Sequence, residues 1–167
     1  MIEPWQRRAP EEANLFNPAF MGALACEYAK EHIRQRDESA PLTYLLIAYA
    51  IVLHAPTRLR LPKTTITSLL AWSQENEDLL VGFPSRQSGV RPYALEGIRF
   101  AIGASALELA DGHALRPGSR KVTFGAAFRR TATAETTEVI ERMKFAARWF
   151  AKSGSEATVL SAWRCRP

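Results

Sequence analysis

The chain has 167 residues, of which 47% are hydrophobic and 10% aromatic. This composition excludes a disordered chain and favours one compact domain over residues 1–167. No run reaches the roughly 18 uncharged apolar residues that a membrane span needs, and residues 1–12 lack the apolar core of a secretion signal. We therefore expect a cytoplasmic protein whose two cysteines are reduced thiols.

The net charge of +5 is concentrated in the C-terminal third of the chain. Residues 1–115 carry 11 Lys/Arg against 13 Asp/Glu, a balance of −2. Residues 116–167 carry 11 against 4, a balance of +7. This asymmetry predicts an anionic partner for the C-terminal end or, as the plainer alternative, a solvated basic surface.

Two long helices are expected in an N-terminal helical part, residues 1–56. Asn17 is placed to cap the first helix and Pro18 suits its first position, while the segment 39–41 ends it. The second helix, at about 42–55, is apolar on almost all sides and should be central, and Pro56 should end it.

Residues 57–118 predict three short helices followed by a β-hairpin. Thr64 or Thr65 can cap the first helix, the second ends at Pro84, and Pro92 begins the third. After the third helix the hydrophobic period changes from that of a helix to that of a strand. This part of the chain is therefore expected to end in strands.

The turn dipeptide Asp111-Gly112 lies between two short apolar runs, which is a strong hairpin pattern. Three helices and then a hairpin is the order of a winged helix-turn-helix. The predicted fold is therefore mainly α with a small β-hairpin wing. A winged helix-turn-helix-like core is framed by the long N-terminal helices and a C-terminal helical segment.

The C-terminal part, residues 119–167, is basic and is predicted to be mostly helical. A short strand is expected at 122–124, after which Thr133 or Thr137 can cap a long amphipathic helix. Ser155 can cap a last short helix. The sequence thus predicts two C-terminal helices that follow a basic, glycine-containing connection.

Candidates for catalysis or metal binding are few. His32, His54 and His113 share no metal-ligand spacing. The adjacent carboxylates Glu11 and Glu12 would point about 100° apart on a helix, so they cannot act as a catalytic pair. The segment 112–121 lacks the spacing and the Lys-Ser/Thr of a phosphate loop. We therefore predict no catalytic, cofactor-binding or metal-binding residue and no enzymatic activity.

A cluster of basic residues is the strongest candidate for a contact surface in the C-terminal part. Phe124 and Phe128 are interleaved with it, and such a patch can meet DNA phosphates or an acidic protein surface. The helix after Pro92 carries few side chains that read bases, so sequence-specific DNA recognition is not expected. The basic candidates are Arg116, Arg120, Lys121, Arg129 and Arg130.

The opening stretch "EEANLFNPAF", residues 11–20, is unusually rich in asparagine and phenylalanine. Asn17 caps the first helix in this interpretation, and Phe16 and Phe20 flank the cap as a hydrophobic staple. Asn14 is placed to close the preceding turn through its side chain. The stretch is therefore predicted to fix how an N-terminal arm is presented, with no ligand required.

Five motifs in order resemble those of a known family. They are "WQRRAPEEANLFNPAF" (5–20), "YLLIAYAIVLHAPTRLRLP" (44–62), "LLAWSQEN" (69–76), "RPYALEGIRFAIGASALELADGHAL" (91–115) and "AARWFAKSG" (146–154). Together they resemble the middle component of ABC-three-component systems, which includes the small subunit of Lamassu anti-phage defence. The resemblance covers most of the chain.

The resemblance implies a non-catalytic adaptor that bridges an SMC-like ABC ATPase and an effector, often a nuclease. It also implies that the adaptor restrains the effector until foreign or aberrant DNA is sensed. ATP and Mg²⁺ would belong to the partner ATPase, with no cofactor in this chain. The residues that we predict at a partner interface are Trp5, Arg7, Arg8, Asn14, Phe16, Asn17 and Phe20.

A second hypothesis rests on the basic C-terminal third alone. It describes a free-standing winged-helix DNA-binding protein whose affinity falls steeply with salt. An adaptor instead predicts exposed apolar or aromatic patches that match protein partners.

Overall fold

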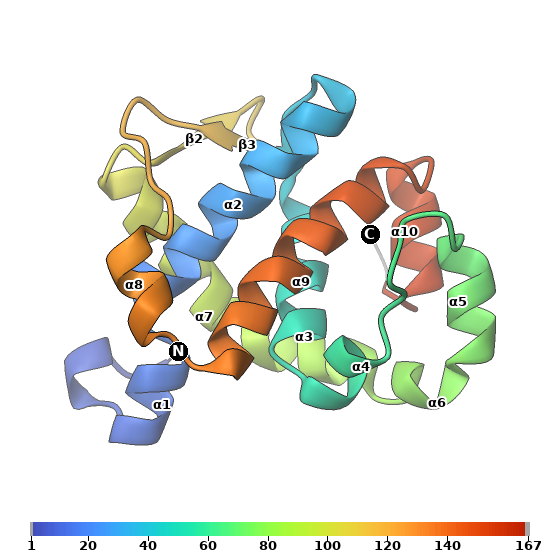
Figure 1. Ribbon diagram of the computed structural model, residues 1–167, viewed down its shortest axis with the longest axis horizontal. Helices are drawn as coiled ribbons and strands as arrows, with labels where there is room; N and C mark the ends of the chain where they lie inside the picture. The colour runs from blue at the N-terminus through green and yellow to red at the C-terminus, as the bar shows by residue number, and fades with distance from the viewer. Residues whose placement is uncertain (1, 166–167) are drawn as a thin grey trace.

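The computed structural model describes residues 2–165, which fold into a mainly helical protein with a small antiparallel sheet (Figure 1). The helices α2 (Pro18–Arg36) and α9 (Ala134–Ala151) lie side by side, with α2 packed on α7 (Phe83–Gly103) and α9 packed on α3 (Leu42–Val52). The elements are η1 (Trp5–Arg7), α1 (Pro10–Leu15), α2 (Pro18–Arg36), β1 (Ala40–Pro41), α3 (Leu42–Val52), α4 (Ala55–Leu59), α5 (Leu69–Glu75), α6 (Glu77–Leu80), α7 (Phe83–Gly103), β2 (Leu107–Ala110), β3 (Ala114–Pro117), α8 (Ala126–Thr131), α9 (Ala134–Ala151) and α10 (Glu156–Ala162).

Three of the predicted helix caps are confirmed. The side-chain oxygen of Asn17 accepts hydrogen bonds from the backbone N–H groups of Ala19 at 2.9 Å and Phe20 at 3.3 Å. Thr133, one of two candidates, caps α9, and Ser155 caps α10. The fourth cap prediction was wrong, because Ser68 and not Thr64 or Thr65 caps α5.

The apolar helix α3 is buried on nearly all sides, as expected, but it ends at Val52. Pro56 does not end it. Pro56 instead lies in the first turn of the separate short helix α4. Backbone N–H groups in the first turn have no partner within the helix, so a proline there costs no hydrogen bond. Residues 57–59 therefore belong to a short helix that was not predicted.

Pro92 lies inside α7 and does not begin a helix, so this prediction was wrong. The helix begins at Phe83 after Gly82, which has a φ of 71°, and Pro84 occupies the first turn. A proline in a helix interior removes one backbone donor. Burial of Ala94 and Ile98 beyond Pro92, on the face that packs against α2 and α3, offsets this loss.

The winged helix-turn-helix arrangement is not confirmed. The third helix of the predicted trio is the 21-residue α7, which packs along α2 and α3 in the centre of the fold. The hairpin itself is confirmed, with left-handed backbone at Asp111 (φ 51°) and Gly112 (φ 74°). Its strand β3 also pairs with β1, which gives the strand order β1-β3-β2.

The connection between the hairpin and α9 differs from the prediction in two ways. Residues 122–124 are not a strand, and α8 follows them at 126–131, where no helix was predicted. Phe124 of this connection is buried in the core. The connection is therefore packed against the body of the protein.

Buried residues from the N-terminal, middle and C-terminal parts share one hydrophobic core cluster. Within this cluster, Trp163, which follows α10, packs against Phe83 with ring centroids 4.8 Å apart and against Trp72 at 5.1 Å. Trp72 in turn meets Trp149 edge-on at 5.7 Å. The short helices α5 and α10 are thus fixed to α7 and α9 by large aromatic side chains. Within residues 2–165, no helix has the length and apolarity to cross a membrane.

Candidate partner-binding site

The N-terminal segment is fixed to the body of the protein by a buried arginine. Arg8 Nη2 donates to Glu96 Oε1 on α7 at 2.8 Å, and Arg8 Nε donates to the carbonyl oxygen of Glu3 at 2.8 Å. The Arg8 guanidinium also lies 5.2 Å from the ring centroid of Tyr93. Arg8, predicted at the partner interface, therefore holds the segment 3–8 against α7 from within.

Tyr93 of α7 holds the opening stretch, residues 11–20, through Glu12 and Phe16. Its hydroxyl donates to Glu12 Oε1 at 2.8 Å, and its ring stacks on Phe16 with centroids 4.0 Å apart. Phe20 packs elsewhere, on Phe124 and Phe128. The two phenylalanines that were predicted to form a staple therefore each hold a different neighbour.

A groove, which we name the α8 groove, separates the opening stretch from α8 and the start of α9. Its volume is about 560 Å³. It brings together three of the predicted interface residues, Asn14, Asn17 and Phe20, with Phe128 of the basic segment. Two large apolar side chains on its border are exposed, Leu15 at 53% and Phe128 at 37%. The remaining lining residues are Leu53, Arg58, Thr131, Ala132, Thr133, Glu135, Thr136 and Val139.

A second groove lies on the other side of Asn17 and contains Trp5. We name it the Trp5 groove, and its volume is about 640 Å³. Trp5 is held in place because its Nε1 donates to the carbonyl oxygen of Ala13 at 2.9 Å. Phe100 and Arg99 of α7 form the opposite wall. Asn17 lines both grooves, so the opening stretch forms the ridge between them.

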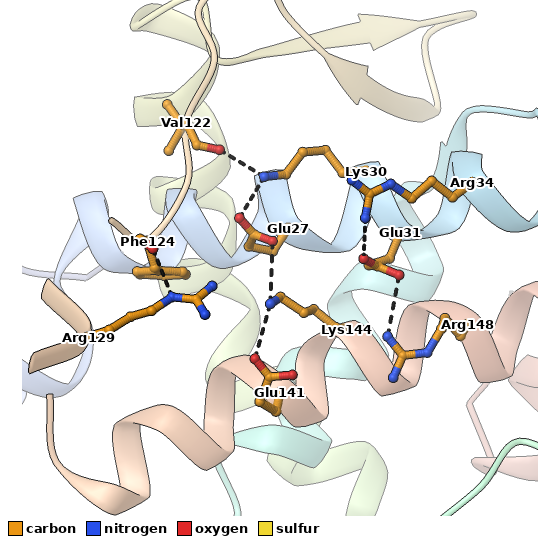
Figure 2. A network of polar contacts seen from close by, with 10 residues as sticks. All are labelled: Glu27, Lys30, Glu31, Arg34, Val122, Phe124, Arg129, Glu141, Lys144 and Arg148. Carbon is orange, nitrogen blue, oxygen red and sulfur yellow. Dashed lines mark hydrogen bonds and ion pairs between the residues drawn. The ribbon is translucent and has the colours of Figure 1, made fainter. Parts of the chain in front are cut away.

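The position of α8 is set by aromatic packing and by two carbonyl contacts. Phe128 of α8 packs on Phe124 with centroids 4.9 Å apart, and Arg129 Nε donates to the carbonyl oxygen of Phe124 at 3.0 Å. Lys30 Nζ on α2 donates to the carbonyl oxygen of Val122 at 2.9 Å (Figure 2). The wall of the α8 groove is thus tied to α2.

The same lysine belongs to a charge network between α2 and α9 (Figure 2). The buried carboxylate of Glu27 lies 2.6 Å from Lys30 Nζ and 3.9 Å from Lys144 Nζ. One turn further along α2, Glu31 pairs with Arg148 of α9 at 3.3 Å. These pairs fix α9, and with it the other wall of the groove, relative to α2.

Arg58 provides a third fixed point, at the floor of the α8 groove. This buried side chain donates from Nε to Glu138 Oε2 and from Nη2 to Glu135 Oε1, both at 2.9 Å. Its Nη1 donates to the carbonyl oxygen of Val52 at 2.7 Å, at the end of α3. The guanidinium thus joins α3, α4 and the first turns of α9.

The basic candidates lie along the β-hairpin, the connection and α8. Arg116 pairs with Glu108 across the hairpin at 2.9 Å, and Arg129 is committed to the Phe124 carbonyl. Arg120, Lys121 and Arg130 are exposed, and no salt bridge to them is found within residues 2–165. Three of the five side chains are therefore available to an anionic partner.

Exposed apolar side chains also occur along the segment 59–81, which contains α5 and α6. Ile66 is 90% exposed and Val81 is 71% exposed, and Leu59 and Leu70 are also mostly exposed. Sequence reasoning missed these exposed side chains. The adjacent leucines 69 and 70 could have indicated one exposed side chain, because a short surface helix can bury only one of two neighbouring residues.

The comparison with protein families decides what kind of chain this is. The family model of the ABC-three component (ABC-3C) system Middle Component 3 matches residues 5–167. The chain belongs to this family. No curated protein and no solved structure matches it. The resemblance to an ABC-three-component middle component is thereby confirmed at the level of the family.

The titratable side chains of this middle component are dispersed. Over residues 2–165, no group of three or more His, Cys, Asp or Glu side chains could hold a metal ion. Burial lowers the pKa of His32 to about 4, and burial also lowers the pKa of His54. Both cysteines are free, and burial raises the pKa of the Cys26 thiol to about 11. A thiol with that pKa is a poor nucleophile at neutral pH.

Proposed function

We propose that this middle component is a non-catalytic adaptor in a Lamassu-type anti-phage defence complex. It bridges an SMC-like ABC ATPase and an effector, for which we propose a nuclease, and it restrains the effector until foreign or aberrant DNA is sensed. The family name implies the other ABC-three-component subunits as partners. ATP and Mg²⁺ would be bound by the ATPase.

The observation that carries the proposal is the presence of two exposed apolar regions at opposite ends of the protein. The Trp5 and α8 grooves lie at the end formed by α1 and α8, and the α5 and α6 helices form the other end of the long axis (Figure 1). Exposed aromatic side chains (Trp5, Phe100 and Phe128) at the first end and exposed aliphatic side chains at the second are typical of protein interfaces. An adaptor needs two such regions far enough apart to bind two partners at once.

Polar contacts that hold the walls of the two grooves also support an interface at the first end. Arg8, Tyr93 and Arg58 hold the walls of the two grooves through buried or partly buried polar contacts. A surface that is already ordered costs less conformational entropy on binding than a mobile one. The grooves are therefore suited to a partner that docks without refolding this chain.

Co-expression of the three components tests the proposal. The ATPase and the effector should co-purify when this chain is present and should separate when its gene is omitted. Purified effector should also show lower nuclease activity on plasmid DNA when it is in the complex without activating DNA. If the two partners associate equally well without this chain, it is not the bridge.

A DNA-binding role is the second candidate, because residues 112–134 contain five Lys/Arg and no Asp/Glu. The isolated chain would then bind a random-sequence duplex with an affinity that falls steeply between about 50 and 200 mM salt. Binding of this kind, together with failure to bind either protein component, would favour the second candidate over the adaptor.

A further inference from the structure

We infer that a groove between α7 and the end of α10 binds an acidic segment of another subunit of the complex. We name it the α7–α10 groove, and its volume is about 610 Å³. The inference rests on the proposed adaptor function and adds a binding place and the chemistry of one partner segment. It follows from the charges that line the groove, the apolar side chains beneath them, and the backbone conformation of Arg164.

The charged side chains that line the α7–α10 groove are two arginines. Arg91 comes from α7 and Arg164 follows α10, and no Asp or Glu among residues 2–165 lines the groove. Both arginines are exposed, and neither forms a salt bridge with any described residue. A hollow lined by one sign of charge concentrates its potential and attracts the opposite charge. The lining itself therefore favours an anionic occupant.

Two carboxylates lie near the groove without neutralising it. Glu156 accepts a hydrogen bond from the hydroxyl of Thr43, a lining residue. Glu77 lines a neighbouring groove beside α5, which shares Arg164 with the α7–α10 groove. Neither carboxylate lies within 4.0 Å of an Arg91 or Arg164 nitrogen, so both guanidinium groups keep their capacity to bind an anion. The shared Arg164 also places the α7–α10 groove next to the α5 end of the protein.

The rest of the lining suits a peptide that carries carboxylates. Gln87, Ser88 and Arg91 follow Pro84 at positions i+3, i+4 and i+7, so one stripe of α7 forms a polar rim. The amide, hydroxyl and guanidinium groups of this rim can all donate hydrogen bonds to carboxylate oxygens. Beneath the rim lie apolar side chains of α3 and α10, namely Leu46, Ile47 and Leu160.

The backbone at Arg164 is the third observation. The N–H of Cys165 donates to the Leu160 carbonyl at 2.9 Å, and the N–H of Arg164 donates to the Ser161 carbonyl at 3.0 Å. These two bonds form a Schellman motif, in which the residue with left-handed backbone is usually glycine. Arg164 occupies that position with a φ of 54°. Glycine would be more favourable there, so the helix end does not explain the arginine, whereas contact with an anion does.

An acidic peptide fits this groove better than DNA does. A peptide can place an apolar side chain against Pro84 and Leu160 and a carboxylate against the two arginines. A phosphate backbone satisfies the arginines but offers no apolar group to the floor. We therefore commit to a protein segment with net negative charge.

Photo-crosslinking in the reconstituted three-component complex identifies the occupant. Ser88, an exposed lining residue, is replaced by p-benzoylphenylalanine, and the crosslinked peptide is sequenced by mass spectrometry. We expect a segment of another subunit that contains several Asp or Glu residues and at least one large apolar residue. The same probe at Gln35, an exposed residue on α2 that does not line the groove, is the control and should not crosslink to that segment.

Two arginine variants provide the second arm. Arg91→Gln and Arg164→Gly should each weaken binding of the crosslinked subunit at least about threefold. Arg164→Gly is informative because glycine suits the left-handed backbone, so this variant should be at least as stable as the unmodified chain in thermal denaturation. Arg34→Gln also removes one exposed positive charge, away from the groove, and should change the affinity less than about twofold.

The outcomes separate this inference from the proposed function. If the subunits fail to assemble, the adaptor function fails and the inference fails with it. If they assemble but Ser88 crosslinks to a segment without acidic residues or to no subunit, the inference alone is overturned. It is also overturned if Arg91→Gln and Arg164→Gly bind the subunit as Arg34→Gln does, or if they weaken binding of a DNA duplex to the isolated chain and leave subunit binding unchanged.

Discussion

Gly22 and Gly97 face each other where α2 crosses α7. A Cβ on Gly97 would lie 2.4 Å from the Cβ of Met21, and a Cβ on Gly22 would lie 2.8 Å from the carbonyl oxygen of Gly97. Real side chains do not approach one another this closely, so the two helices can cross at this distance only because both residues lack a side chain. The crossing positions the opening stretch, since α2 begins directly after it.

The first prediction concerns this crossing. Gly97→Ala should lower the free energy of unfolding by about 1–3 kcal/mol, because the new methyl group overpacks the contact with Met21. Gly89→Ala is the control in the same helix, since a methyl group added there would have no atom within 4 Å. It should raise stability by about 0.5–1 kcal/mol through helix propensity. Urea denaturation of both variants measures the two changes in the free energy of unfolding. Equal changes would show that Gly97 is not needed for the close approach of α2 and α7.

The second prediction concerns Arg58 at the floor of the α8 groove. Arg58→Met removes the partner of the Val52 carbonyl and of two carboxylates, so the free energy of unfolding should fall by about 2–4 kcal/mol. Glu135→Gln should cost less than about 1 kcal/mol, because the Glu135 side chain is largely exposed and its ion pair is screened by solvent. Thermal or urea denaturation should rank the two variants in this order. The reverse order would show that Arg58 does not have the role assigned to it.

The third prediction concerns the tie between Lys30 and the connection that leads to α8. Lys30→Met removes the hydrogen bond to the Val122 carbonyl and one of the cations near Glu27. Amide hydrogen exchange should become faster in residues 119–131 while the centre of α3 remains protected. Arg34→Met removes only an exposed ion pair on the same helix and should leave the exchange unchanged. Equal exchange in the two variants would mean that Lys30 does not hold this segment.

The fourth prediction is a pH dependence that originates in His32. Its pKa is about 4 in the folded protein and near 6.5 when unfolded, because burial disfavours the charged imidazolium. Between these values the unfolded chain binds more protons, so stability is fully present above about pH 6.5 and falls as the pH drops toward 4. The loss from this group should reach at most about 3 kcal/mol.

Urea denaturation at several pH values between 7 and 4 measures this effect. His32→Leu should be less sensitive to pH over that window, while carboxylates contribute equally to both proteins. If the two proteins lose stability in parallel, His32 is not the source of the pH dependence.

Local features of the fold were predictable from sequence, whereas long-range contacts were not. The caps at Asn17, Thr133 and Ser155 and the turn at Asp111-Gly112 follow from residue types within a few positions. Pro92 was misinterpreted as a helix start, because proline is common in the first turn of a helix. Here the burial of residues beyond Pro92 keeps the helix continuous through the proline. That burial depends on α2 and α3, which lie far away in the chain.

The candidate site shows the same division. The opening stretch and the basic segment were each identified as interface candidates, and Asn17, Phe20 and Phe128 do meet at one groove. The internal role of Arg8 could not be predicted, because its partner Glu96 lies 88 residues away. Which of several arginines is buried depends on tertiary packing, and a sequence pattern shows only that a positive charge is present.

The proposed adaptor uses two separate ends of this chain to bind two different partners. The sharpest experiment on this proposal measures the binding of the ATPase and the effector, each by itself, to the variants Phe128→Glu and Leu70→Glu after circular dichroism has shown both to be folded. Both substitutions change exposed side chains, one on α8 and one on α5. We expect each variant to lose one partner, a different one in each case, and to retain the other. Variants that both retain both partners, or that both lose the same partner, would show that the two ends do not act as separate binding sites.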